Sequence, residues 1–271
     1  MYRFAVFGDP VAHSKSPEIH HRFAEQTGLD VRYEKHQVQP RDFQTRVTQF
    51  FADGGNGLNI TVPHKLAAFQ LCEDLTPEAE IAGACNTLMR TEKGLLGHNT
   101  DGLGLVDDLE RLGWYPDQLR ILILGAGGAV AGCLGPLLSA GAEEVVIANR
   151  SVEKAEHLAE RFGRRVSATA LEELDRQRGP FDLVINGISA GLSGSTGVML
   201  TDRLLNDQGA CYDLIYGAQD TPFLKMCSSL TAHRADGLGM LLGQAARSFE
   251  LWTGVYPDPF VQLPDFGRDT G

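Results

Sequence analysis

The sequence lacks the features that most directly suggest a nucleic acid, a membrane or a metal as partner. Its 24 Lys and Arg residues are outnumbered by 35 Asp and Glu residues, giving a net charge of −11, and an acidic surface repels polyphosphates and anionic lipids. No apolar run approaches the ~18–20 residues that span a bilayer, and the N-terminus, MYRFAVFGDP, lacks a signal-peptide pattern. The eight histidines include no HxxxH or HExxH pair, so we expect no metal cofactor.

Cysteine patterns typical of disulfide frameworks or metal sites are also missing. The five cysteines form no CxxC pair and are scattered along the chain at Cys72, Cys85, Cys133, Cys211 and Cys227. Such spacing is typical of reduced thiols in a cytoplasmic protein. We therefore expect a cytoplasmic protein with neither nucleic-acid nor membrane partner; the sequence leaves monomer or homodimer open.

What the sequence contains is a regular alternation of strand-like and helix-like segments, over 271 residues that suffice for two domains. The first part predicts strands at 3–8, 31–38 and 58–62, helices at 16–27, 40–52, 65–73 and 77–84, and a hairpin at 86–96. After a connecting helix at 102–112, strands are predicted at 119–124, 144–148, 166–168, 181–186 and 210–213, and helices at 129–140, 153–161 and 238–253. This pattern indicates an α/β fold with mostly parallel sheets.

A glycine-rich turn follows the apolar strand in the stretch LRILILGAGGAVAG. Gly125 permits a sharp turn, Gly127 lets the backbone approach a pyrophosphate, and the helix beginning near Ala129 offers free amides to the anion. Glycines also occur in such turns for steric reasons alone. Because a strand precedes and a helix follows, we expect Gly125, Ala126, Gly127, Gly128 and Ala129 to bind a dinucleotide.

The end of the next strand predicts which dinucleotide is bound. NAD-specific proteins place an acid there to bind the ribose 2′-hydroxyl, but this chain has Asn149, Arg150, Ser151 and Lys154. Two cations and a hydroxyl suit a 2′-phosphate, so we expect NADP. A solvated loop with ordinary charges, including Glu153, is the alternative.

Two polar segments in the first half suit a carboxylate ligand and acid–base chemistry. Ser14 and Ser16 flank the start of the first helix, where side-chain donors and the helix dipole favour a carboxylate; capping alone would also explain Ser16. Thr61 lies where a strand ends, and Lys65 starts a helix, where a cation is electrostatically disfavoured. A lysine there suggests acid–base chemistry, although many such lysines are simply solvated.

A third polar segment, His98-Asn99-Thr100-Asp101-Gly102, follows the predicted hairpin. Asp101 on its own is explained as a helix N-cap. Beside Lys65 it becomes a candidate partner in a Lys/Asp pair, in which the carboxylate orients the ammonium.

Seven motifs occur in one order and at one spacing: SKSP at 14–17, NITVPHK at 59–65, AGACNT at 82–87, NTDG at 99–102, GAGGA at 125–129, NRS at 149–151 with Lys154, and DGLGMLLGQA at 236–245. Together they resemble the shikimate dehydrogenase family, which reduces 3-dehydroshikimate with NADPH in aromatic amino-acid biosynthesis. The resemblance extends from the first strand to about residue 257. It implies a substrate-binding catalytic domain of residues 1–101, completed by residues 237–271, and a Rossmann-like NADP-binding domain of residues 102–236.

The resemblance also implies roles for individual residues. Lys65 would be the catalytic acid/base and Asp101 its partner. The substrate would be bound by Ser14, Ser16, Thr61, Asn86, Tyr216 and Gln244, the carboxylate by the two serines. The cofactor would be bound by Gly125, Ala126, Gly127, Gly128, Ala129, Asn149, Arg150, Ser151, Lys154, Leu214 and Gly237. His13 and His64, which adjoin these residues, are interpreted as supporting or solvent-facing side chains.

Three departures from the family pattern bear on the cofactor and on the alternatives. Ile188 replaces a usual threonine in the nicotinamide loop 186–191, Lys154 stands where arginine is common, and Pro77 occupies an often acidic position. The first two leave the preference for NADP over NAD open. A quinate/shikimate dehydrogenase shares the site residues, and a non-catalytic NADP(H)-binding regulatory paralogue is the alternative from another class; Lys65 and Asp101 argue against the latter.

Overall fold

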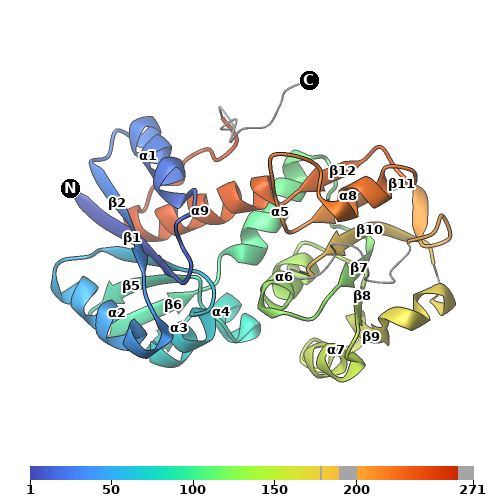
Figure 1. Ribbon diagram of the computed structural model, residues 1–271, viewed down its shortest axis with the longest axis horizontal. Coiled ribbons are helices and arrows are strands. Elements are labelled where there is room, and N and C mark those ends of the chain that lie inside the picture. The colour runs from blue at the N-terminus through green and yellow to red at the C-terminus, as the bar shows by residue number, and fades with distance from the viewer. Residues whose placement is uncertain (178, 189–199, 262–271) are drawn as a thin grey trace. The chain divides into compact units, whose positions relative to one another are not determined.

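The computed structural model of the chain describes residues 1–177, 179–188 and 200–261. It forms two compact units, one of residues 1–104 with 241–261, the other of residues 105–240. The chain leaves the N-terminal unit within helix α5 (Asp101–Arg111) and returns within helix α9 (Leu238–Thr253). Figure 1 shows the elements of both units. Among the described residues, no helix combines the length and the hydropathy needed to cross a bilayer.

The N-terminal unit is built on a six-stranded mixed sheet of order β2-β1-β3-β5-β6-β4. Its strands are β1 (Tyr2–Gly8), β2 (Val31–Gln37), β3 (Gly57–Ile60), β4 (Asp74–Leu75), β5 (Thr87–Thr91) and β6 (Gly94–His98), and its other helices are α1 (Ser16–Thr27), α2 (Phe43–Ala52), α3 (Lys65–Leu71) and α4 (Pro77–Ala82). Strand β1 pairs in parallel with β2 and β3, whereas β3-β5-β6 is antiparallel.

Helices cover both faces of this sheet. Successive side chains of a strand point to opposite faces, so the apolar strand β1 packs against a helix on each side. Phe4 of β1 packs against Phe249 and Trp252 of α9. Phe7 of the same strand packs against Phe50 of α2 on the other face. The polar residues that end β3 and begin α3 and α5 are thus supported by a core on either side.

The C-terminal unit contains a six-stranded sheet of order β12-β11-β10-β7-β8-β9 in which every pairing is parallel. Its elements are β7 (Arg120–Leu124), α6 (Gly128–Ser139), β8 (Glu144–Asn149), α7 (Val152–Ala159), β9 (Val166–Ala170), β10 (Phe181–Asn186), β11 (Leu205–Asp213), α8 (Pro222–Cys227) and β12 (Arg234–Asp236). This is the strand order of a Rossmann-type dinucleotide-binding sheet. The predictions of an α/β fold and of a Rossmann-like parallel sheet are confirmed.

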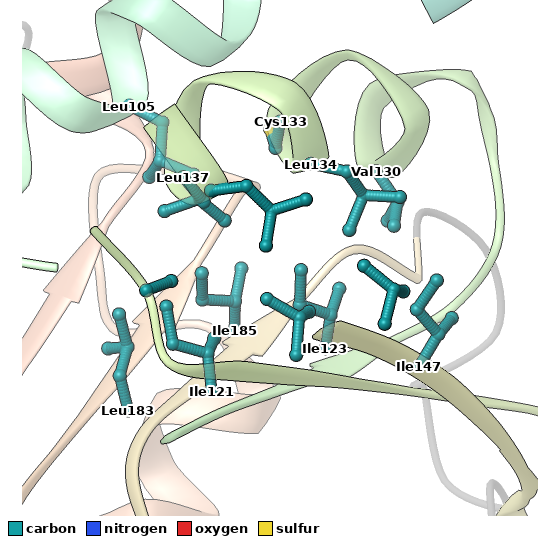
Figure 2. Packing of buried hydrophobic residues seen from close by; sticks show 14 of the residues in the cluster. Leu105, Ile121, Ile123, Val130, Cys133, Leu134, Leu137, Ile147, Leu183 and Ile185 are labelled. Atoms are coloured by element: carbon teal, nitrogen blue, oxygen red, sulfur yellow. The ribbon is translucent and has the colours of Figure 1, made fainter. Parts of the chain in front are cut away.

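After Arg120, strand β7 is apolar because both of its faces are buried. Ile121 and Ile123 contact the cluster that includes Val130 and Leu134 of α6, and Figure 2 shows these side chains interlocking between the helix and the strands. Leu122 belongs to a second cluster on the opposite face, with residues of α8. This packing fixes the turn between β7 and α6.

The structure corrects several predicted boundaries. β3 ends at Ile60 rather than residue 62, and β11 begins at Leu205 rather than residue 210. The elements β4, α8 and β12 were not predicted; they span two, six and three residues, too few to show a hydrophobic period. Helix α1 takes Lys15 as its N-cap, with no side-chain capping bond, so capping does not explain Ser16.

Candidate active site

Lys65 and Asp101 form an ion pair in the N-terminal unit. They are the first residues of α3 and α5, and Lys65 Nζ lies 2.5 Å from Asp101 Oδ2. The lysine side chain is 26% exposed and the aspartate side chain 9%, so the ammonium remains accessible while the carboxylate is almost enclosed. The Asp101 amide donates to Asn99 Oδ1 at 3.1 Å. Asn99 therefore caps this turn, and the Asp101 carboxylate holds the ammonium instead.

Asn86 joins this pair to its surroundings. Its Nδ2 donates to Asp101 Oδ1 at 2.8 Å and to Thr100 Oγ1 at 2.8 Å. Its Oδ1 accepts from the Thr100 amide at 2.9 Å and from Thr87 Oγ1 at 2.9 Å. The side chain is 2% exposed, so its orientation is set by buried partners. Gln244 of α9 lies beside it, with 3.4 Å between Asn86 Nδ2 and Gln244 Oε1.

A buried polar network lies behind Asn86, formed by residues for which the sequence predicts no role. It consists of Asn59, Thr87, Thr100 and Ser248. Asn59 Nδ2 donates to the Asn86 carbonyl at 3.2 Å and to Ser248 Oγ at 3.0 Å. Ser248 Oγ lies 2.7 Å from Thr87 Oγ1. Asn59 lies in the segment NITVPHK and Thr100 in the segment 98–102. The one sequence feature that points to Asn59 is its polar side chain in an otherwise apolar strand.

The network continues to the two serines at the start of α1. The Tyr33 hydroxyl donates to Asn59 Oδ1 at 2.7 Å and is also hydrogen-bonded to Ser16. Burial raises the pKa of Tyr33 well above its usual range, so this hydroxyl keeps its proton. Ser14 Oγ donates to Ser16 Oγ at 3.2 Å. A chain of hydrogen bonds thus connects Ser14 to the Lys65–Asp101 pair.

A cavity of about 260 Å³ adjoins Ser14 and is lined by residues that include Lys15, Glu18 and Lys35. Lys35 Nζ donates to the carbonyl of Ala12 at 2.7 Å, which holds the lysine beside the turn. Two of the six lysines of an acidic protein therefore lie around Ser14, where they favour an anion.

Thr61 and the histidines occupy distinct environments. Thr61 follows β3, and its amide donates to the Phe7 carbonyl at 2.9 Å. A Cβ on Gly8 would lie 2.4 Å from Thr61 Cγ2, so only glycine fits beside it. His64 is buried, with Nε2 2.7 Å from the Val38 carbonyl oxygen, and so has a supporting position, whereas His13 is exposed.

The glycine turn in the C-terminal unit has the geometry of an anion site. Gly125 has a φ of +102°, and a Cβ there would lie 3.2 Å from the backbone of Gly187, so the sharp turn requires glycine. Gly127 is the N-cap of α6 and, as a glycine, has no side chain that could accept from the first amides of the helix. A Cβ on Gly127 or Gly128 would meet no heavy atom within 4 Å. The first amides of α6 are thus approachable by a pyrophosphate.

The turn after β8 gathers the residues predicted to select NADP. Asn149 ends the strand and donates from Nδ2 to the Ser151 carbonyl at 2.8 Å. Ser151 is the N-cap of α7 and makes no side-chain capping bond. Arg150, Ser151 and Lys154 are exposed at this helix N-terminus, where the helix dipole adds to the two cations. This arrangement fits a ribose phosphate.

A third group of predicted residues lies where β10, β11 and β12 end. Leu214 follows β11, and a Cβ on Gly237 would lie 2.3 Å from the Leu214 carbonyl oxygen, so the two segments touch. Tyr216 is half-buried, and burial followed by the charge of Asp236 raises its pKa. Ile188 is described, whereas Ser189, Ala190 and Gly191 of the predicted nicotinamide loop lie outside the described residues.

Asp213, which the sequence analysis did not single out, organises these strand ends. It accepts from Asn186 Nδ2 at 2.9 Å, from Thr221 Oγ1 at 2.5 Å and from the Ile215 amide at 3.1 Å. Burial raises the pKa of its carboxyl. A lone acid at the end of a strand gave no spacing signal.

The geometry agrees with comparisons to known proteins. Residues 6–88 match the shikimate dehydrogenase substrate binding domain, residues 111–203 the shikimate / quinate 5-dehydrogenase domain and residues 237–259 the shikimate 5′-dehydrogenase C-terminal domain. A curated relative from Cellvibrio japonicus (strain Ueda107), named shikimate dehydrogenase (NADP(+)), is 50% identical over 94% of this chain and 93% of the relative. The chain belongs to the shikimate dehydrogenase family.

Similar solved structures agree with this assignment. An Ael1 enzyme from Pseudomonas putida is 40% identical, with a TM-score of 0.89 over 95% of each chain. The shikimate 5-dehydrogenase of Thermus thermophilus, solved in complex with NADP(H) and shikimate, is 36% identical, with a TM-score of 0.84 over 96% of each chain. The family resemblance drawn from the seven motifs is confirmed.

Proposed function

We propose that this chain catalyses the reversible, NADP(H)-dependent reduction of 3-dehydroshikimate to shikimate. The observation that carries the proposal is the accessible Lys65 ammonium held 2.5 Å from the nearly enclosed Asp101 carboxylate, in a chain that belongs to the shikimate dehydrogenase family. A protein that only sensed the ligand would have no use for a positioned proton donor.

In this proposal Lys65 and Asp101 act on the proton. The dihydronicotinamide supplies the hydride when bound. The Lys65 ammonium donates a proton to the oxygen of the substrate carbonyl as negative charge develops there, and the neutral amine takes it back in the reverse direction. Asp101 holds Nζ in place and stabilises its charged form, while Asn86 fixes the second oxygen of that carboxylate.

The remaining residues of the N-terminal unit orient the substrate. Ser14 and Ser16 bind the carboxylate through their hydroxyls, beside the first turn of α1. Thr61, Asn86 and Gln244 bind ring hydroxyls. Lys15 and Lys35, which border the cavity at Ser14, favour the carboxylate electrostatically.

We propose that the C-terminal unit holds NADP(H). The turn of Gly125–Ala129 binds the pyrophosphate at the N-terminus of α6. Asn149 and Ser151 bind the adenosine ribose, and Arg150 and Lys154 its 2′-phosphate. Leu214 and Gly237 contact the nicotinamide, and Tyr216 reaches the substrate. The absence of an acid where β8 ends supports NADP over NAD.

A spectrophotometric assay at the nicotinamide absorbance tests the proposal, with shikimate or quinate and NADP⁺ or NAD⁺ in all four combinations. We expect the highest kcat/KM for shikimate with NADP⁺. If quinate with NAD⁺ is the better pair, the chain is a quinate dehydrogenase. If both ligands bind calorimetrically without turnover, it is a regulatory paralogue.

We also propose a cytoplasmic location and a monomer or homodimer. The cysteines are all thiols in the structure, as expected in a reducing compartment. Cell fractionation tests the location, and light scattering of the purified protein gives the number of subunits.

A further inference from the structure

Two cysteine sulfur atoms lie together beside the candidate active site. A Cβ on Gly97 of β6 would lie 2.5 Å from Cys85 Sγ and 2.7 Å from Cys72 Sγ. The two sulfur atoms are therefore neighbours across the space left by the absent side chain of Gly97, and their thiols are hydrogen-bonded to each other. Any larger residue at position 97 would push them apart.

The two thiols differ in accessibility. Cys72 is partly exposed, whereas Cys85 is buried. The hydrogen bond from Cys85 lowers the pKa of Cys72, and the same bond together with burial raises the pKa of Cys85. Cys72 is thus the thiol that reacts first with a molecule in solution, and Cys85 is placed to react with the product.

Both cysteines are connected to catalytic segments. Cys72 is the C-cap of α3, the helix that begins with Lys65. Cys85 directly precedes Asn86, and its amide donates to the Lys65 carbonyl at 3.0 Å. A covalent bond between the sulfur atoms would join the end of the Lys65 helix to the segment that carries Asn86.

We propose that Cys72 and Cys85 form a redox modification site, which a low-molecular-weight disulfide oxidises to an intramolecular disulfide that lowers turnover. The Cys72 thiolate attacks one sulfur of the small disulfide, forming a mixed disulfide and releasing one small thiolate. Cys85, after losing its proton, attacks Cys72 Sγ, and the second small thiolate leaves. Two protein thiols are oxidised by two electrons, and the small disulfide is reduced to two thiols.

Oxidation affects catalysis through position. The new S–S bond of about 2.05 Å is shorter than any non-bonded contact between sulfur atoms, so the two segments move toward each other. Asn86, the neighbour of Cys85, moves with them, and with it the partner of Asp101. Because displacements of about 1 Å can cost a hundredfold in rate, we expect kcat to fall about tenfold or more.

The protein contains a matched control pair. Cys211 and Cys227 are also hydrogen-bonded to each other, but both are completely buried. They resemble the first pair in proximity and differ in access. Oxidant in solution should leave them as thiols while the fold is intact.

The experiment incubates the full-length protein with mixtures of reduced and oxidised glutathione of increasing oxidising power. Remaining thiols are alkylated, and digestion and mass spectrometry follow. We expect the peptides of Cys72 and Cys85 to become linked with the loss of two hydrogen atoms, and kcat for shikimate to fall in parallel. Dithiothreitol should restore the free thiols and the rate. Cys211 and Cys227 should be found alkylated at every ratio, which shows that they remained thiols.

The variant Cys72→Ser separates this site from general oxidation. It should have wild-type kcat under reducing conditions and keep it in oxidised glutathione. The proposal is overturned if Cys72 and Cys85 are found alkylated, and hence unoxidised, at every ratio of oxidised to reduced glutathione. It is also overturned if Cys72 retains glutathione without linking to Cys85, or if the linked protein turns over at the wild-type rate.

Discussion

Replacement of Lys65 by alanine is the most direct perturbation of the proposed mechanism. The variant removes the ammonium that lies 2.5 Å from Asp101 Oδ2 and leaves the Asn86 contact to the other oxygen in place. General acid–base assistance is worth about 10²–10⁴ in rate, so kcat should fall by that factor, which is about 3–5 kcal/mol in the activation free energy.

Binding and stability should change much less than turnover. The serines, Thr61 and Gln244 remain to hold the substrate, so we expect its Kd to rise by less than about tenfold, or 1.4 kcal/mol. Because the Asp101 carboxylate that loses its charged partner is only 9% exposed, the variant should lose about 1–3 kcal/mol of folding free energy. A Tm decrease of about 2–10 °C is expected from that loss.

The assay measures initial rates of NADPH oxidation, with Kd from calorimetry and Tm from circular dichroism. Lys93→Ala is a matched control, because Lys93 is an exposed lysine of the same unit, in the β5–β6 turn; it should retain wild-type kcat. A Lys65→Ala variant with kcat within threefold of wild type would remove Lys65 from the mechanism. A loss of turnover that merely follows loss of folded protein would do the same.

Three further predictions concern the aspartate, the cofactor and the response to acid. Asp101→Asn keeps an oxygen that can accept from Asn86 but loses the negative charge that faces Lys65. We expect kcat to fall about 10–100-fold, consistent with about 1.5–3 kcal/mol for a hydrogen bond to a charged group. Stopped-flow or steady-state rates measure this change. In the double variant Arg150→Ala and Lys154→Ala, the KM for NADPH should rise at least tenfold while that for NADH changes little; equal changes would contradict 2′-phosphate binding. Burial lowers the pKa of His20 from its ordinary 6.5 to about 3. Between these two pH values the imidazole binds a proton in the unfolded state but not in the folded state. The free energy of unfolding therefore falls as pH drops from 6.5 toward 3, by about 1.4 kcal/mol per pH unit. Urea titrations should show a flatter acid limb for His20→Phe and an unchanged one for the exposed neighbour in His21→Gln.

The fold was predictable where hydrophobic patterns are long. β7 reads as a continuous apolar strand because Ile121 and Leu122 point into cores on opposite faces. Helix α9 was predicted with its observed bounds, Leu238–Thr253, because sixteen residues show the helical period several times. The strand β4 has two residues and owes its existence to pairing with β6, which only the folded chain supplies.

The site was predictable to the extent that its residues stand in local motifs. Lys65 and Asp101 attract attention because a lysine at a helix start is disfavoured and a nearby acid explains it. The contact of Asn59 with Ser248 joins residues 189 positions apart, and no spacing rule relates them. The same holds for Tyr33. In the sequence it is an ordinary aromatic strand residue, and only the fold places its hydroxyl beside Asn59.

The candidate sites of the two units differ in how tightly their residues depend on one another. Asn86 contacts Asp101, Thr87 and Thr100 through one buried amide, so in the proposed mechanism substrate orientation and the position of the proton donor depend on the same hydrogen bonds. Arg150 is exposed on a turn at a helix N-terminus. Changes within the buried network should therefore alter kcat and KM together, whereas changes on the turn should alter cofactor affinity alone. In the proposed mechanism, cofactor preference is thus open to adjustment through a few exposed side chains, while the substrate chemistry depends on the buried network.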